Sequence, residues 1–246
     1  MFQGIGDLVL PATCPGCGMR RQPSMCLCAR CAELLQHPPR QISPRAGGLV
    51  PIWAAQNYGV REVKSVLLAA KDRRDPAAIE TMAAAIDAML RKLVAAGVLL
   101  DPRLKPWVLV PAPTRKSSAR TRGGDPITAV CRQVARRQQG GRMWVAPLLV
   151  TREHAADSAG LSAQQRSVNL RGQLRIDAEI WQRFQQAASC SAANSSNKQT
   201  PTKTTSELQI ILVDDVVTTG ATLRHSVLTL GAMGLQTTIA SVFSAA

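Results

Sequence analysis

The chain has 246 residues, of which 46% are hydrophobic, so it can form one sizeable globular domain and a small additional module. Its 30 basic and 16 acidic residues give a net charge of +14, which favours anionic ligands such as pyrophosphate or nucleic acid. No apolar run reaches the roughly 20 residues of a membrane helix, and residues 1–11 lack the basic start of a signal peptide, so we expect a cytoplasmic protein without membrane insertion.

Five of the seven cysteines lie close together near the start of the chain. Cys14 and Cys17 form one C-x₂-C knuckle and Cys28 and Cys31 form a second, a spacing typical of a tetrahedral zinc site. Four thiolates would close the coordination sphere, so the Zn²⁺ would be structural. Cys26 is a spare ligand that could replace Cys28, and disulfide bonds are the alternative, which a cytoplasmic location disfavours.

The cysteines define a predicted zinc-finger-like module over residues 1–40, followed by a larger domain over 41–246. The larger domain begins in a segment, 36–51, whose Pro, Gly and Arg content is typical of a connector. A strand is predicted within 50–58, and the apolar spacing of 61–70 predicts a helix.

The middle of the chain carries helix-start signals. Asp75 followed by a proline predicts a helix that ends at Gly97, and Asp125, again followed by a proline, predicts a helix to about Gln139. Between these two helices, the apolar run 107–110 predicts a buried strand.

The second half of the chain alternates in the same way. A short strand is predicted at 147–150, a capping box at 162–165 predicts a helix start, and 177–188 has amphipathic helical spacing. The segment 187–206 has almost no large apolar side chains, and we interpret it as a flexible insert. Alternating helices and short apolar strands predict an α/β fold, with an open, mostly parallel sheet flanked by helices.

The most informative segment is 210–223. A buried strand over 210–213 precedes Asp214 and Asp215, and a Thr/Gly turn over 218–222 opens a helix. Backbone N–H groups and a helix N-terminus suit a phosphate, whereas the carboxylates suit sugar hydroxyls or hydrated Mg²⁺. Together these groups predict a ribose-phosphate site, with an ordinary strand–turn–helix that carries acidic caps as the alternative.

This segment resembles the phosphoribosyl pyrophosphate (PRPP) signature of type I phosphoribosyltransferases. The resemblance implies that Asp214 and Asp215 are the catalytic carboxylates that hold the ribose hydroxyls of PRPP. It also implies a loop that cradles the 5′-phosphate, formed by Val217, Thr218, Thr219, Gly220, Ala221 and Thr222.

The order of a four-cysteine module before such a domain resembles the ComF (ComF/GntX) family. The likeness is carried by the segments 7–11, 71–75, 110–125 and 160–172. It implies a type I phosphoribosyltransferase fold with a module like a double zinc ribbon. It also implies a pyrophosphate loop, formed by Ala112, Pro113, Thr114, Arg115 and Lys116, and further candidate residues at Lys71, Arg122, Arg166 and Asn169.

The chain departs from that family in places that concern the acceptor. Residues 122–125 read Arg-Gly-Gly-Asp where the family usually has Arg-Gly-Phe-Asn, and the insert 187–206 is longer than expected. Arg166 and Asn169 are one helical turn apart and could line the acceptor side or simply lie on the surface.

Two functions follow from these resemblances. The first is an enzyme, a Mg²⁺-dependent glycosyltransferase that moves phosphoribose between PRPP and an unidentified nitrogenous acceptor. The second is a non-catalytic protein that senses PRPP or a nucleotide, or that handles single-stranded DNA during competence and DNA uptake. The eight basic residues between 111 and 142 suit either ligand, although eight aromatic residues in the whole chain are few for base stacking.

Overall fold

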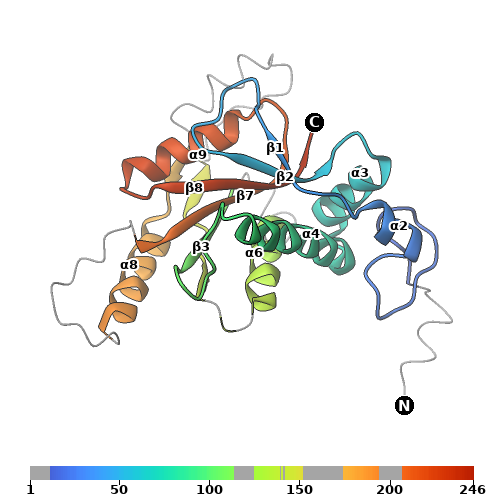
Figure 1. The fold of residues 1–246 in the computed structure, drawn as a ribbon, viewed down its shortest axis with the longest axis horizontal. Coiled ribbons are helices and arrows are strands. Elements are labelled where there is room, and N and C mark those ends of the chain that lie inside the picture. Colours follow the sequence, from blue (N-terminus) through green and yellow to red (C-terminus); the bar gives the residue numbers. More distant parts are fainter. Residues whose placement is uncertain (1–11, 114–124, 139, 141, 152–173, 194–206) are drawn as a thin grey trace.

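The structure is a computed structural model that describes residues 12–113, 125–138, 140, 142–151, 174–193 and 207–246, of which 188–193 are described by their backbone only. Its centre is a six-stranded sheet in the order β1-β2-β8-β7-β3-β4 (Figure 1). The strands β2, β8, β7, β3 and β4 run parallel, and β1 pairs antiparallel with β2 at one edge. The strands of this sheet are β1 Arg40–Ile42, β2 Ile52–Asn57, β3 Trp107–Pro111, β4 Met143–Val145, β7 Gln209–Val217 and β8 Thr237–Ala245.

Helices connect these strands, and a second, two-stranded sheet pairs β5 with β6 in antiparallel fashion. The helices are α2 Ala29–Leu34, α3 Arg61–Leu68, the π-helix η1 Ala69–Arg73, α4 Pro76–Ala95, α6 Pro126–Arg137, α8 Ala178–Ala193 and α9 Ala221–Ala232; the small sheet consists of β5 Leu149–Thr151 and β6 Leu174–Ile176. The predicted α/β class, with a mostly parallel sheet flanked by helices, is confirmed.

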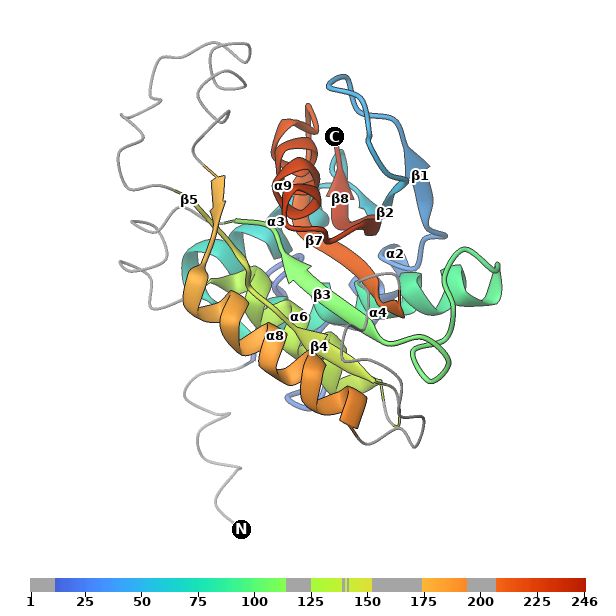
Figure 2. The same cartoon turned by 90° about the vertical axis from the view of Figure 1, so that its left-hand side faces the viewer.

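The two faces of the sheet form two separate cores, because alternate residues of a strand point to opposite faces. Leu109 and Ile211 belong to the core that also contains the buried residues of α3, α4 and α6. Val108 and Ile210 belong to the other core, which α9 and β5 cover and against which α8 packs. Figure 2 shows α9 on one side of the sheet and α4 on the other.

Both predicted helix starts are confirmed. The Asp75 carboxylate accepts a hydrogen bond from the N–H of Ala77, and the Asp125 carboxylate accepts from Ile127 and Thr128. Such N-caps each stabilise a helix by about 1 kcal/mol. Cys131, buried within α6, is part of the core as expected.

Strands β1, β4 and β6 were not predicted, and three predicted elements differ in their bounds or pairing. Helix α8 continues to Ala193, so the first part of the predicted insert 187–206 is helical and Cys190 lies in a helix instead of a loop. Strand β7 continues to Val217, beyond the predicted end at Val213. The strand predicted at 147–150 starts later, at Leu149, and pairs with β6 outside the main sheet.

The remaining predictions fall partly outside the described residues. The helix start at 162–165 and residues 194–206 of the insert lie there, as do residues 1–11. Within the described part of the chain, no helix combines the length and apolarity needed to cross a bilayer.

Candidate functional site

The Asp214–Asp215 pair lies where β7 extends beyond its neighbour β3. The pairing between β3 and β7 ends at Pro111 and Val213, whereas β7 remains paired with β8 as far as Val217. The two carboxylates therefore belong to a strand that is fixed on one side and has lost its strand partner on the other. This position is the carboxyl end of a parallel strand, where ligands bind in open α/β sheets.

The start of the predicted pyrophosphate loop lies directly beside the carboxylates. The N–H of Ala112 donates a 2.7 Å hydrogen bond to the carbonyl of Val213, the residue before Asp214. Of this loop, Ala112 and Pro113 belong to the described part of the chain, whereas Thr114, Arg115 and Lys116 lie outside it. The further candidates Arg122, Arg166 and Asn169 also lie outside the described residues.

The two carboxylates have different surroundings although both are half-buried. One Asp214 oxygen accepts a 2.8 Å hydrogen bond from the N–H of Asp215. Burial, and after it the negative charge of Asp215, raise the pKa of Asp214 to about 8. Asp214 therefore holds a proton over much of the neutral pH range, until a ligand or cation changes its surroundings.

Lys71 provides a cation to this site from the described part of the chain. Its Nζ lies 2.7 Å from Oδ2 of Asp215, and the two side chains are 36% and 14% exposed. Lys71 belongs to η1, which ends at Arg74 in a left-handed conformation with φ 51°. The sequence identified Lys71 as a candidate residue, and the structure brings it to the carboxylates from a segment that lies far away in the chain.

The turn that follows β7 leads directly into α9. Gly220, with φ 82°, precedes the first helical residue and has no side chain to cap α9, and the hydroxyl of Thr219 accepts a 3.4 Å hydrogen bond from the N–H of Ala221. The first N–H groups of a helix have no partner within the helix, so this end can bind an anion. The predicted phosphate loop from Val217 to Thr222 thus consists of the end of β7, this turn and the first two residues of α9.

The connector between β1 and β2 packs against this turn, which the sequence did not predict. The N–H of Ala46 donates a 2.9 Å hydrogen bond to the carbonyl of Thr219. A Cβ atom on Gly220 would lie 2.7 Å from Pro44, so the turn needs glycine both for its positive φ and for this close approach. Pro- and Gly-rich composition signals a connector but carries no information about what it contacts.

The described residues thus bring together Lys71, Ala112, Asp214, Asp215 and the turn at Thr219. A buried strand, two carboxylates, one lysine and a helix N-terminus can together bind a ligand that has hydroxyl groups and a phosphate. The carboxylates could also accept hydrogen bonds from the water ligands of a Mg²⁺ ion.

A second site lies in the N-terminal module. The sulfur atoms of Cys14, Cys17, Cys28 and Cys31 all lie within 4.8 Å of one another. The four cysteines predicted as ligands therefore lie close enough together to hold one metal ion, and Cys26 is not part of the cluster.

The backbone around the cluster favours a metal ligand. Burial alone would raise the pKa of Cys14, but backbone N–H groups of Cys28, Cys17 and Gly16 outweigh it and lower the pKa to about 7. The first knuckle is a tight turn in which the N–H of Gly18 donates to the carbonyl of Cys14. The second knuckle spans the first turn of α2, with Cys28 at its N-cap. Four clustered sulfurs, one with a lowered pKa, fit a tetrahedral metal ion.

Comparisons with known proteins add no family: no protein-family model matches the chain, and a search of curated proteins finds no match. The likeness to the ComF family therefore stays a prediction made from the motifs.

Proposed function

We propose that the protein binds PRPP and transfers its phosphoribosyl group to, or from, a nitrogenous acceptor. The observation that supports this most strongly is the short distance along the chain between two kinds of group. Asp214 and Asp215 lie in the part of β7 that extends beyond β3, and the N-terminus of α9 follows the end of β7 after a three-residue turn, Thr218–Gly220. A ribose 5-phosphate needs both kinds of group at such a spacing.

Each part of the site then has a role. The N–H groups at the start of α9 and the threonine hydroxyls of the turn would bind the 5′-phosphate. The carboxylates of Asp214 and Asp215 would accept hydrogen bonds from the ribose 2′- and 3′-hydroxyls. Lys71, next to Asp215, would offset the negative charge of the carboxylate and attract the pyrophosphate group.

The reaction replaces one bond at the anomeric carbon with another. The C–O bond to pyrophosphate breaks, a C–N bond to the acceptor forms, and positive charge develops on the ribose ring in the transition state. Carboxylates beside the ring stabilise that charge because they are fixed before the reaction begins. Mg²⁺ bound with PRPP would neutralise the departing pyrophosphate, and the carboxylates of Asp214 and Asp215 could hold its water ligands.

We propose a structural Zn²⁺ at the four-cysteine cluster. All four ligands are protein thiolates, which leaves no open position for a catalytic water. Such a site requires reduced thiols, so a cytoplasmic location is part of the proposal.

A second candidate is a protein that senses PRPP or nucleotides, or that handles single-stranded DNA during competence. The net charge of +14 favours this function because a basic surface binds nucleic acid phosphates. Such a protein would bind its ligand at the same ribose-phosphate site without catalysing a reaction.

The decisive experiment is calorimetric titration of PRPP with Mg²⁺ into the protein and into an Asp214→Asn/Asp215→Asn variant. Both substitutions keep the side-chain volume, so the fold should persist while PRPP binding falls below detection. Undiminished affinity in the variant would refute the site. Pyrophosphate release on addition of a nucleobase panel then separates the enzyme from the sensor, and a short single-stranded DNA tests the second candidate.

A further inference from the structure

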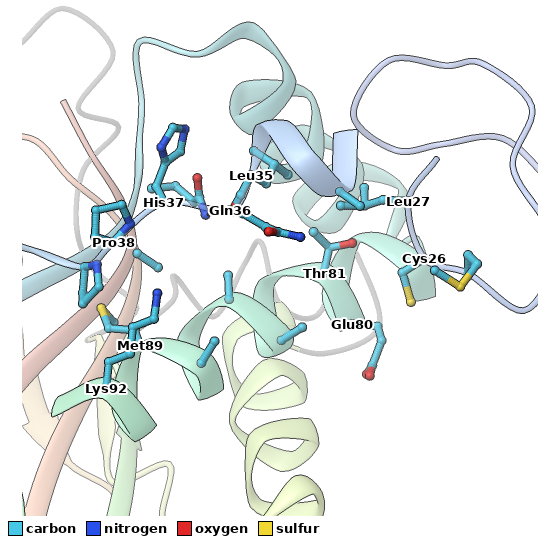
Figure 3. Close-up of a pocket in the computed structure, with 18 residues that line it drawn as sticks. Cys26, Leu27, Leu35, Gln36, His37, Pro38, Glu80, Thr81, Met89 and Lys92 are labelled. Carbon is cyan, nitrogen blue, oxygen red and sulfur yellow. Dashed lines mark hydrogen bonds between the residues drawn. The ribbon is translucent and has the colours of Figure 1, made fainter. Parts of the chain in front are cut away.

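A cavity of about 630 Å³ lies between α4 and the chain on either side of α2 (Figure 3). It is lined by residues 25–27, 32 and 35–39 on one side, by α4 between Glu80 and Lys92 on the other, and by Ala55 and Gln56 of β2. Its volume falls in the range of sites that bind small organic molecules, about 300–1,000 Å³. The residues that line it include none of the proposed PRPP site.

The cavity exists because α4 presents small side chains at helical spacing. Ala84, Ala85 and Ala88 are half-buried and line it, and each stands where a larger residue would fill the space. Leu35 and Met89 add apolar wall. A ligand with an apolar group bound in the cavity would therefore shield these side chains from water.

Gln56 provides one polar group inside the cavity. It is 3% exposed, and its Nε2 donates a 2.6 Å hydrogen bond to the carbonyl of Leu35, which fixes the orientation of the amide. Its Oε1 is buried and has no hydrogen-bond partner among the described residues. A buried acceptor without a partner is costly, so this oxygen favours a ligand with a neutral N–H or O–H donor.

Charged side chains are distributed unevenly around the cavity. Lys92 and His37 are exposed and lie on opposite walls toward one end of the cavity, and Glu80 lies toward the other end (Figure 3). Glu80 is in an ion pair with Arg137, so its charge is already offset. Lys92 therefore favours a ligand with an anionic group at that end.

From these features we infer that the cavity is a binding site for a small amphipathic anion. The ligand has an apolar body that lies on the three alanines, a neutral hydrogen-bond donor for Oε1 of Gln56, and an anionic group near Lys92. This site is separate from the proposed phosphoribosyl chemistry and does not depend on it.

The experiment uses 2-anilinonaphthalene-6-sulfonate, which has an apolar body, one N–H donor and one sulfonate. Calorimetric titration into the zinc-loaded full chain should show one site. The matched probe 2-phenoxynaphthalene-6-sulfonate replaces the N–H with an ether oxygen and should bind about fivefold more weakly, the loss of one neutral hydrogen bond. In Gln56→Met the two probes should bind equally, whereas a difference that persists would overturn the role of Gln56.

Two further pairs of variants locate the site. Ala88→Trp fills the cavity and should weaken 2-anilinonaphthalene-6-sulfonate at least tenfold, while Ala95→Trp, on the exposed end of the same helix, should bind as the unmodified protein does. Lys92→Ala should weaken it about threefold, as expected for one partly solvated charge, while Lys64→Ala on α3 should not. Equal effects within either pair, or no binding at all, would overturn the proposal. The probe comparison requires no substitution, so it holds even if the tryptophan variant does not fold.

Discussion

The Nζ atom of Lys71 lies 2.7 Å from Oδ2 of Asp215, although α4, β3 and α6 separate the two residues along the sequence. The ion pair joins the π-helix η1 to the end of β7. Both groups are partly exposed, so the pair contributes little to stability, roughly 1 kcal/mol or less. Its value lies in placing a cation beside the carboxylates of the proposed site.

The first prediction concerns this lysine. Lys71→Met keeps an unbranched side chain that is one atom shorter and removes its charge, so PRPP should bind about tenfold more weakly, with little change in melting temperature. Calorimetry measures the affinity, and Lys64→Met on α3 serves as the control of equal charge. An unchanged PRPP affinity would show that Lys71 serves only to pair with Asp215.

The second prediction concerns pH. Asp214 has a pKa raised to about 8, against an ordinary value of 3.8, so the folded protein binds its proton more tightly than the unfolded chain. The stabilisation is complete below pH 4 and is lost as the pH rises to 8, with a slope of at most about 1.4 kcal/mol per pH unit. Urea unfolding between pH 5 and 9 should show this decline, and Asp214→Asn should flatten it.

The same pKa gives a prediction for the ligand. A protonated Asp214 accepts fewer hydrogen bonds from ribose hydroxyls, so ribose 5-phosphate should bind more tightly as the pH rises from 7 to 9. In Asp214→Asn the affinity should be low and constant over this range, because the phosphate is already fully ionised. A parallel rise in both proteins would assign the effect to another group.

The fourth prediction concerns the metal. The purified protein should contain about one zinc ion per chain, and Cys14→Ser should lose it and lower the melting temperature. Cys26→Ser should keep both the metal and the stability, because Cys26 lies outside the cluster. Metal analysis and thermal unfolding test this directly. Full stability in metal-free protein would refute a structural zinc.

The fifth prediction separates two requirements at Gly220. Gly220→Ala places a Cβ at φ 82° and 2.7 Å from Pro44, whereas Gly234→Ala has a similar φ of 78° and no atom within 4 Å. Backbone strain should lower the free energy of unfolding of both variants by roughly 1 kcal/mol. In Gly220→Ala, overpacking against Pro44 should lower it by about 1–3 kcal/mol more. Adding Pro44→Gly should recover part of that difference. An equal loss of stability in the two alanine variants would show that the connector moves away from the added Cβ atom without cost.

Much of the fold was predictable because its signals are local. The helix starts at Asp75 and Asp125 depend on a cap and a following proline, and the apolar run 210–213 identified the strand of the site. The clustering of the four cysteines followed from their spacing alone. The end of β7 was missed because the strand continues through Asp214 and Asp215, where it remains paired with β8. The end of α8 was missed because residues 189–193 lack the large apolar side chains that mark a helix in the sequence.

The site was less predictable where it depends on contacts between distant segments. The sequence identified Lys71 but not its partner, because nothing local links η1 to Asp215. It did not identify the packing of Pro44 on Gly220, or the cavity whose buried acceptor is Gln56. Short edge strands such as β1 were also missed, since three exposed or half-exposed residues have no apolar pattern.

The path of the connector has a consequence for how the chain can be divided. Composition places the boundary between the two parts at residues 40 and 41, yet that boundary cuts β1, which spans Arg40–Ile42. The chain continues from β1 to Pro44 and Ala46, which hold the turn before α9. A protein trimmed at residue 41 would keep every carboxylate of the site but loosen the anchor of its phosphate turn. Removal of residues 1–40 should therefore affect the proposed site, and the trimmed chain should bind a phosphate ligand more weakly than the full chain does.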